Sequence, residues 1–301
     1  MLFTPIKPML LHMGNNNEIV DDISWLYEIK WDGWRILLHK KYDSVEAYTR
    51  HGNNVTAKFP ELHSVGKSIK EDIAIIDCEG VVLRNGLSVF DDFNYRGRLS
   101  NKDKINQATL THPATFIAFD VLATDSNQTN KPLIERKDIL KSIVEPSDNL
   151  LITPSVIGNG SNAFEITKEK GMEGIIGKRS NSVYKTNHRS KDWLKYKHFK
   201  LMDVVILGYK ENPFTMIVGV NLSNGKYRPV ASVEFGFKPE EKTAFREIAK
   251  QIISKVERDL IWLEPLLHCK VQYLERTASG SLRIVSFKGF DFDNVLEPTN
   301  K

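Results

Sequence analysis

The spacing of short strand-like segments is the feature that most constrains the fold of this 301-residue chain. Irregular intervals separate these segments, rather than the regular strand–helix–strand units of a parallel sheet. The expected strands are 27–29, 35–39, 45–49, 73–83, 115–122 and 174–178, and the expected helices are 59–69, 133–144 and 163–170. This pattern predicts an α+β domain with antiparallel sheets.

After residue 200 the strands become shorter and turn signals punctuate them. Strands are expected at 203–209, 217–222, 228–235 and 269–276, with turns at 211–213, 223–225 and 278–280. A helix is expected at 240–258, where four apolar side chains recur at helical spacing: Phe245, Ile248, Ile252 and Val256. A short-stranded β domain with one inserted helix is typical of a small barrel such as the oligonucleotide-binding (OB) fold. We therefore predict two domains, residues 1–201 and 202–301.

The cysteine content and the apolar runs of the sequence indicate the cellular compartment in which the chain is expected. Two cysteines, Cys78 and Cys269, lie far apart and offer neither a disulfide framework nor the paired spacing of a zinc site. No apolar run approaches the roughly 20 residues that span a bilayer, and residues 1–8 lack the apolar core of a signal peptide. We therefore expect a cytoplasmic protein without a membrane segment.

Positive charge is concentrated in one stretch, although the net charge of +4 is modest. Within residues 185–200 only Asp192 opposes six lysines and arginines, and Trp193, Tyr196 and Phe199 are interleaved with them. Such a run is either a solvated face or a surface that binds phosphate backbones and bases. Composition alone favours neither interpretation.

The segment 28–35, Glu-Ile-Lys-Trp-Asp-Gly-Trp-Arg, carries the clearest chemical signal. Strand-like residues precede and follow it, so Lys30 is expected at a turn. A lysine amine is nucleophilic only when uncharged, and burial or nearby cations lower its pKa enough to allow this. Gly33 lets the backbone approach a ligand, and the forked guanidinium of Arg35 suits phosphate. The plain alternative is a surface hairpin with an exposed lysine.

Residues 30–35 match the signature Lys-x-Asp-Gly-x-Arg, and further motifs follow in a fixed order. They are Thr-Arg-His-Gly at 49–52, Asp-Cys-Glu-Gly at 77–80, the strand 116–122, Glu-Gly-Ile-Ile-Gly-Lys at 173–178 and Trp-Leu-Lys-Tyr-Lys at 193–197. On these motifs the chain resembles the covalent nucleotidyltransferases. Among them it is most similar to minimal bacterial or viral ATP-dependent DNA ligases and to the ligase module of bacterial end-joining enzymes. The resemblance implies an adenylation domain followed by an OB-fold domain.

The resemblance also implies roles for the matching residues. Lys30 takes up AMP, with Arg35, Lys195 and Lys197 assisting the chemistry. The remaining nucleotide contacts fall to Glu28, Glu79 and Phe119, whose ring is expected to stack on adenine. A carboxylate beside a triphosphate needs a divalent ion, so Glu79 and Glu173 are the expected ligands of Mg²⁺, or of Mn²⁺ in its place. Each residue also has an ordinary structural explanation, such as a core phenylalanine or a salt-bridged acid.

Three basic residues are the expected nucleic-acid contacts. By resemblance, Arg50 binds the 5′-phosphate of a nick. Residues 282–289 resemble an Arg-x-Pro-x-Phe-x-Gly stretch that precedes the last family motif, but Val285 replaces the usual proline. The following residues, 290–293, lack the usual arginine and lysine, and Arg283 and Lys288 are the candidates to replace them.

The predicted function is that of a monomeric, ATP-dependent DNA ligase. It would use ATP and Mg²⁺ to seal 3′-hydroxyl/5′-phosphate nicks in duplex DNA through lysyl-AMP and DNA-adenylate intermediates. An RNA ligase or an mRNA-capping-type nucleotidyltransferase would use the same lysine. A non-catalytic nucleic-acid-binding protein is the alternative from another class, because it could keep the fold without the chemistry.

Overall fold

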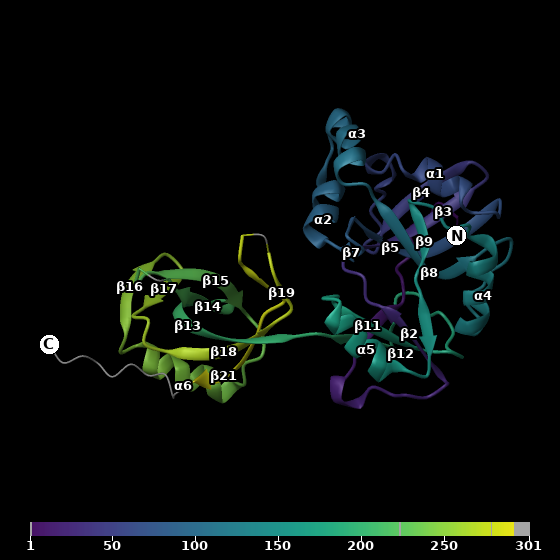
Figure 1. The fold of residues 1–301 in the computed structure, drawn as a ribbon. Coiled ribbons are helices and arrows are strands. Elements are labelled where there is room, and N and C mark those ends of the chain that lie inside the picture. Colours follow the sequence, from purple (N-terminus) through teal and green to yellow (C-terminus); the bar gives the residue numbers. More distant parts are fainter. Residues whose placement is uncertain (1, 223, 278, 292–301) are drawn as a thin grey trace. The chain divides into compact units, whose positions relative to one another are not determined.

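The computed structural model describes residues 2–222, 224–277 and 279–291, and it divides into two units, Met1–His198 and Phe199–Lys301 (Figure 1). Ser223 and Ala278, which belong to two predicted turns, lie outside the described residues, as do Phe292 and Asp293 of the weakened final motif. Each unit has a hydrophobic core of its own.

Two five-stranded sheets frame the first unit. The first sheet has the order β1 (Leu10–Met13), β12 (Arg189–Lys197), β11 (Gly174–Arg179), β2 (Trp25–Ile29) and β10 (Ser155–Ile157). The second has the order β4 (Ser44–Thr49), β3 (Trp34–Lys41), β5 (Ile73–Val81), β8 (Thr115–Ala123) and β9 (Leu150–Ile152). Neighbouring strands are antiparallel except for the pairs β1–β12 and β8–β9. The predicted mixed architecture with mainly antiparallel sheets is confirmed.

Short helices complete the first unit. They are α1 (Leu62–Lys67), α2 (Phe90–Arg98), α3 (Lys102–Thr111), α4 (Leu133–Ile143) and α5 (Gly160–Glu169), with 3₁₀ turns at Asn16–Glu18 and Thr56–Lys58 and a small ribbon of β6 (Leu83–Arg84) and β7 (Leu87–Ser88). Nothing among the helices of the described residues has the length and apolar character needed to cross a membrane.

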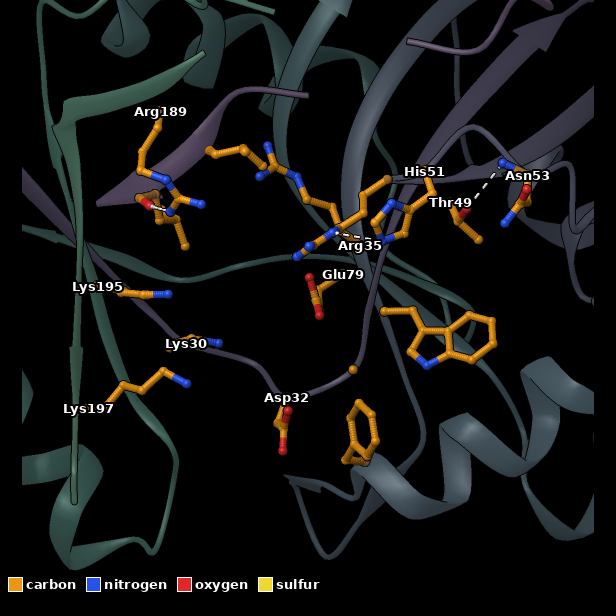
Figure 2. A pocket seen from close by; sticks show the side chains of 16 residues that line it. Lys30, Asp32, Arg35, Thr49, His51, Asn53, Glu79, Arg189, Lys195 and Lys197 are labelled. Atoms are coloured by element: carbon orange, nitrogen blue, oxygen red, sulfur yellow. Dashed lines mark hydrogen bonds between the residues drawn. The ribbon is translucent and has the colours of Figure 1, made fainter. Parts of the chain in front are cut away.

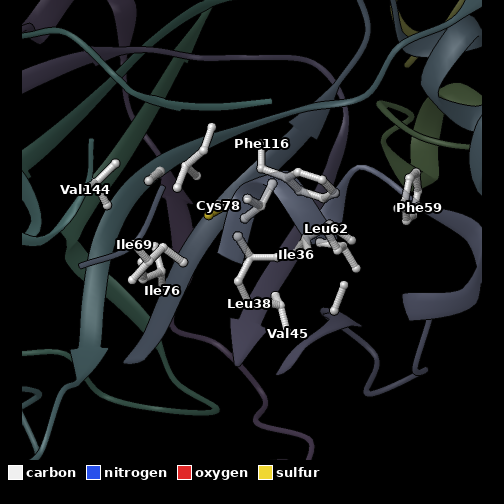
Figure 3. Close-up of a cluster of buried hydrophobic side chains, with 14 of the residues drawn as sticks. Ile36, Leu38, Val45, Phe59, Leu62, Ile69, Ile76, Cys78, Phe116 and Val144 are labelled. Carbon is white, nitrogen blue, oxygen red and sulfur yellow. The ribbon is translucent and has the colours of Figure 1, made fainter. Parts of the chain in front are cut away.

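The second sheet is buried on both faces, which explains the continuous apolar character of its strands. Ile36 and Leu38 of β3 point into a core beneath α1 and α4, together with Cys78 and Phe116 (Figure 3). The alternate residue Leu37 joins a second core with Trp193 and other side chains of the first sheet. Side chains on inward-facing positions of both sheets therefore meet between them, and the functional site lies there.

The second unit is an antiparallel sheet built around its long first strand, β13 (Lys200–Glu211). β13 pairs with β14, β17 and β18. The other elements are β14 (Phe214–Asn221), β15 (Tyr227–Val233), α6 (Pro239–Ala249), β16 (Ile253–Glu257), β17 (Leu260–Leu263), β18 (His268–Tyr273), β19 (Glu275–Arg276), β20 (Leu282–Arg283) and β21 (Ser286–Asp291). Phe245 and Ala249 of α6 are buried in the core of this unit.

The predicted helix at 240–258 is wrong beyond its first half. α6 starts at Pro239 but ends at Ala249, and Ile253–Glu257 forms β16, which pairs with β17. Ile252, Ile253 and Val256 are β-branched, and such residues favour strands. Their spacing coincided with a helical period, although the chain there forms one arm of a hairpin.

Candidate active site

Lys30 lies on the crossover between the two sheets of the first unit. β2 ends at Ile29 in one sheet and β3 begins at Trp34 in the other, so the two strands are not partners in a hairpin. The backbone N–H of Lys30 donates to the Gly174 carbonyl at 2.9 Å, which ties the crossover to β11. The Lys30 side chain is 16% exposed. The surface-hairpin alternative therefore does not apply.

A cleft of about 550 Å³ opens beside Lys30 (Figure 2). The side chains of Lys30, Lys195 and Lys197 extend into it from one side, and Glu79 and Asp32 lie across from them. The lining also includes Arg35, Arg50, His51, Phe90 and Arg189. Motifs from four separate parts of the sequence are thus brought to one cleft.

Lys30 forms an ion pair at the cleft wall. Its Nζ lies 2.7 Å from Glu173 Oε2, and Glu173 Oε1 lies 2.6 Å from Lys197 Nζ. Burial acts to lower the pKa of Lys30, but the neighbouring carboxylates, of which Glu173 is the strongest, raise it above its usual value. The predicted low pKa is therefore wrong for this arrangement, because the ion pair outweighs burial. To serve as a nucleophile, Lys30 would have to leave Glu173 and lose a proton.

The two other cleft lysines show the opposite tendency. Burial, followed by the charge of Lys197 and then of Lys30, lowers the pKa of Lys195 below its usual value. Burial also lowers the pKa of Lys197, although Glu173 opposes the shift. Three ammonium groups close together repel one another, and an anion such as a phosphate would relieve that repulsion.

Glu79 is the carboxylate that faces this group from β5. Among the described residues it makes no hydrogen bond or close ion pair through its side chain. Burial raises the pKa of Glu79 to about 8, and repulsion from Glu173 and Asp32 adds to the effect, while Lys30 and Arg35 act against it. A carboxyl group whose pKa lies near neutral pH, in a cleft lined by charged side chains, is a candidate for a functional role.

Arg35 has its guanidinium engaged within the protein. Nε and Nη2 donate to the two Asp77 carboxylate oxygens at 2.9 and 2.5 Å, and Nη1 donates to the Met9 carbonyl at 2.6 Å. The Tyr184 hydroxyl donates to Asp77 Oδ2 at 2.6 Å. Buried Asp77 raises the pKa of Arg35 against the effect of burial. Tyr184 was missed at the sequence level, because it belongs to no motif.

A narrower recess extends from the cleft toward Phe119 and Trp193, and Glu28 and Lys178 also line it. The Lys178 Nζ lies 4.4 Å from the Phe119 ring centroid and 4.2 Å from the Trp193 ring centroid. Arg35 lies over the Phe119 ring at 5.2 Å. Phe119 is half-buried, so part of its ring is open to this recess. Trp193 and Lys178 were not singled out as site residues from the sequence.

Aromatic residues in the basic run do not form a base-stacking surface. Trp193 and Tyr196 are each 1% exposed and belong to two cores of the first unit. Arg189 of the same run is exposed at the cleft rim. Arg50, from another part of the chain, is also exposed there, and its Nε donates to His51 Nε2 at 3.2 Å. Trp193 and Tyr196 lie on opposite faces of β12, whereas Lys195 and Lys197 alternate with Trp193 on the face that lines the cleft.

Arg283 and Lys288 belong to the second unit. Arg283 lies on β20 and forms an ion pair with Glu275 of β19. Lys288 is exposed on β21.

Facing sheets with a buried lysine at their crossover make the first unit a nucleotidyltransferase-type domain. Residues 8–197 match the family model described as ATP dependent DNA ligase domain. The bifunctional non-homologous end joining protein LigD of Bacillus subtilis (strain 168) is 34% identical over 286 residues, which cover 89% of this chain and 46% of that protein. This chain thus spans about half the length of that relative.

Two further matches extend over nearly the whole chain. The SPbeta prophage-derived DNA ligase-like protein LigB of the same organism is 33% identical over 290 residues, covering 95% of this chain and 98% of that protein. The structure of mycobacterial DNA ligase D complexed with ATP and MES matches with 25% identity, a TM-score of 0.57 and 95% coverage of both chains. The chain belongs to the ATP-dependent DNA ligase family.

Proposed function

We propose that this chain seals 3′-hydroxyl/5′-phosphate nicks in duplex DNA, using ATP and a covalent AMP on Lys30. One observation carries the proposal: Lys30 lies at a sheet crossover, in a cleft that also collects Lys195 and Lys197. Family membership supports the same reaction.

In the first step the Lys30 amine would attack the α-phosphorus of ATP. A P–N bond forms, the bond to pyrophosphate breaks, and the amine loses a proton. That proton would pass to solvent once Lys30 has separated from Glu173, because the ion pair holds Lys30 as an ammonium. Lys195 and Lys197 would hold the α-phosphate oxygens and stabilise their charge in the transition state. Storing AMP on the protein splits a difficult condensation into easier steps.

The recess beside the cleft would receive the base. Its walls include the partly open ring of Phe119 and the carboxylate of Glu28. Arg35 would act mainly through position, because Asp77 and the Met9 carbonyl already engage its guanidinium. Its charge nevertheless lies beside the cleft and favours bound anions.

Glu79 and Glu173 would hold Mg²⁺, or Mn²⁺ in its place. Among the described residues no three His, Cys, Asp or Glu side chains are grouped closely enough for a ready-made metal site. Mg²⁺ commonly takes one or two carboxylates together with substrate phosphates, so the pair fits an ion that arrives with the nucleotide. The repulsion that helps to raise the pKa of Glu79 supports a cation at this position. The ion would supply charge neutralisation at the triphosphate.

Nicked DNA would then receive AMP on its 5′-phosphate, and attack by the 3′-hydroxyl would release AMP. Arg50, exposed at the cleft rim, would bind the 5′-phosphate. The second unit would be an OB-fold domain that contacts DNA through Arg283 and Lys288. Its long first strand pairs with three others, and a helix follows β15, which is the pattern of that barrel.

The test compares the wild-type chain with Lys30→Ala. With Mg²⁺ and α-labelled ATP, the wild type should gain one covalent AMP and close a nicked duplex, whereas Lys30→Ala should do neither. Lys40→Ala is the matched control, because Lys40 is a buried lysine on β3 whose Nζ bonds the Ile69 carbonyl away from the cleft. It should still take up AMP.

Other outcomes would identify another function. Label from GTP in place of ATP would indicate a capping-type enzyme, and closure only of RNA nicks would indicate an RNA ligase. Salt-sensitive DNA binding without any covalent nucleotide would indicate a non-catalytic binding protein. Label retained by Lys30→Ala would refute the assignment of the nucleophile.

A further inference from the structure

Lys137 is a buried lysine outside every motif of the sequence. It projects from α4 and is 1% exposed. Its Nζ forms an ion pair and hydrogen bond with Glu28 Oε1, and it donates to the Phe119 carbonyl at 3.1 Å. A buried ammonium is costly unless it is paired and hydrogen-bonded, and Lys137 has both kinds of partner.

The two partners of Lys137 belong to different sheets. Glu28 is on β2 of the first sheet, and Phe119 is on β8 of the second. Lys137 therefore links the sheets through one polar contact to each, directly behind the recess that Glu28 and Phe119 line. Lys30 lies two residues beyond Glu28, directly after the end of β2, so the strand that carries the linked carboxylate leads straight into the nucleophile.

Glu28 is paired on its other side as well. Lys178 Nζ lies 2.6 Å from Glu28 Oε2, above the rings of Phe119 and Trp193. Two lysines share one carboxylate, and all three side chains are about 1% exposed. Without Lys137, Glu28 would have only Lys178 to orient it, and no side chain of α4 would link Glu28 to β8.

We propose that Lys137 is a positioning residue for the nucleotide: by linking Glu28 to the strand of Phe119, it sets the width and the polar edge of the base recess. This inference rests on the proposed function, because it concerns binding of the same nucleotide. Lys137 touches neither the cleft nor the reacting atoms. It acts through Glu28 and Phe119.

The test measures the KM for ATP and the kcat of nick sealing, together with Tm. Lys137→Gln should raise the KM roughly tenfold with a much smaller change in kcat, because a charged hydrogen bond to Glu28 is lost. Lys137→Arg should restore most of the affinity, because it keeps the charge. Lys40→Gln is the matched control: it should lower Tm and leave the KM unchanged, since Lys40 bonds a carbonyl away from the cleft.

A double-mutant cycle separates positioning from simple stabilisation. If Lys137 acts through Glu28, the variant Glu28→Gln/Lys137→Gln should have nearly the KM of Glu28→Gln alone. Additive effects on KM would overturn the proposal, as would a wild-type KM for Lys137→Gln. If Lys137→Gln does not fold, the same cycle with Lys137→Met decides the question by the same criterion, because methionine fills a similar buried volume without the charge. Failure of the wild type to take up AMP would refute the proposed function instead.

Discussion

At the scale of single residues, Glu79 lines the proposed active-site cleft, and ionising its carboxyl group there costs stability. Its pKa is about 8 in the folded protein against 4.5 as its ordinary value. Between these two pH values the unfolded chain has lost the proton and the folded chain retains it. Stability therefore falls as pH rises through this window, because the folded state binds more protons than the unfolded state.

Glu79→Gln should remove that dependence. At pH 4 the variant and the wild type should have similar free energies of unfolding, since Glu79 is then mostly protonated in both the folded and the unfolded chain. At pH 8 the variant should be more stable by about 2 kcal/mol, a value reduced because the side chain is partly open to the cleft. Denaturant unfolding at both pH values measures the difference, and Glu145→Gln, at an exposed position, is the control. An equal difference at both pH values would contradict the prediction.

The sequence motifs supplied residues that line one cleft, but they did not reveal the residues that support this lining. Lys30, Glu79, Lys195 and Lys197 belong to motifs, and they do line one cleft. Lys137 and Tyr184 lie outside the motifs, and their partners are distant in sequence. No local pattern reveals such pairs, because only the folded chain brings them together. The ion pair of Lys30 with Glu173 was missed for the same reason, and with it the direction of the Lys30 pKa.

At the scale of elements, the crossover from β2 to β3 depends on Gly33. A Cβ at this position would lie 2.0 Å from the Gly80 carbonyl oxygen of β5, and a backbone atom in a sheet cannot move aside easily. Gly33→Ala should therefore displace the crossover that carries Lys30. We expect a loss of about 2 kcal/mol or more in the free energy of unfolding, together with a large loss of Lys30 adenylylation.

Gly66→Ala is the matched control for this prediction. Gly66 lies on α1, where alanine favours the helix, and its Cβ would meet the end of the Val45 side chain at 3.0 Å. That contact can relax, so stability should change little and adenylylation should be retained. Thermal unfolding and AMP uptake measure both variants. Equal losses in the two variants would show that the crossover is not specially constrained.

Elements were predicted best where periodicity and burial agree. The strands β3, β5 and β8 have long apolar runs because both faces of their sheet are covered, and all three were expected. α2 and α3 were not expected: only Phe93, Arg96 and Gly97 are buried on α2, and only Ile105 and Ala108 on α3. Helices that bury so few apolar side chains leave a weak pattern in the sequence.

At the scale of the whole molecule, charge is nearly balanced, with 42 lysines and arginines against 38 acids. Attraction of DNA must therefore come from local basic groups rather than from the overall field. If Arg283 and Lys288 contact phosphates, Arg283→Ala/Lys288→Ala should weaken binding to a nicked duplex. It should also reduce the slope of log K against log salt by about two, one for each lost contact.

The decisive comparison for this prediction keeps the charge change constant. Lys210→Ala/Lys255→Ala also removes two ion-paired positive charges from the same unit, at positions that match no ligase motif, so the salt slope should change less. Binding measured over a range of salt concentrations gives both slopes. If Arg283→Ala/Lys288→Ala keeps the wild-type slope but forms lysyl-AMP slowly, the two residues act on ATP and not on DNA. They would then replace the missing basic residues of the final motif, because departure of pyrophosphate also requires cations.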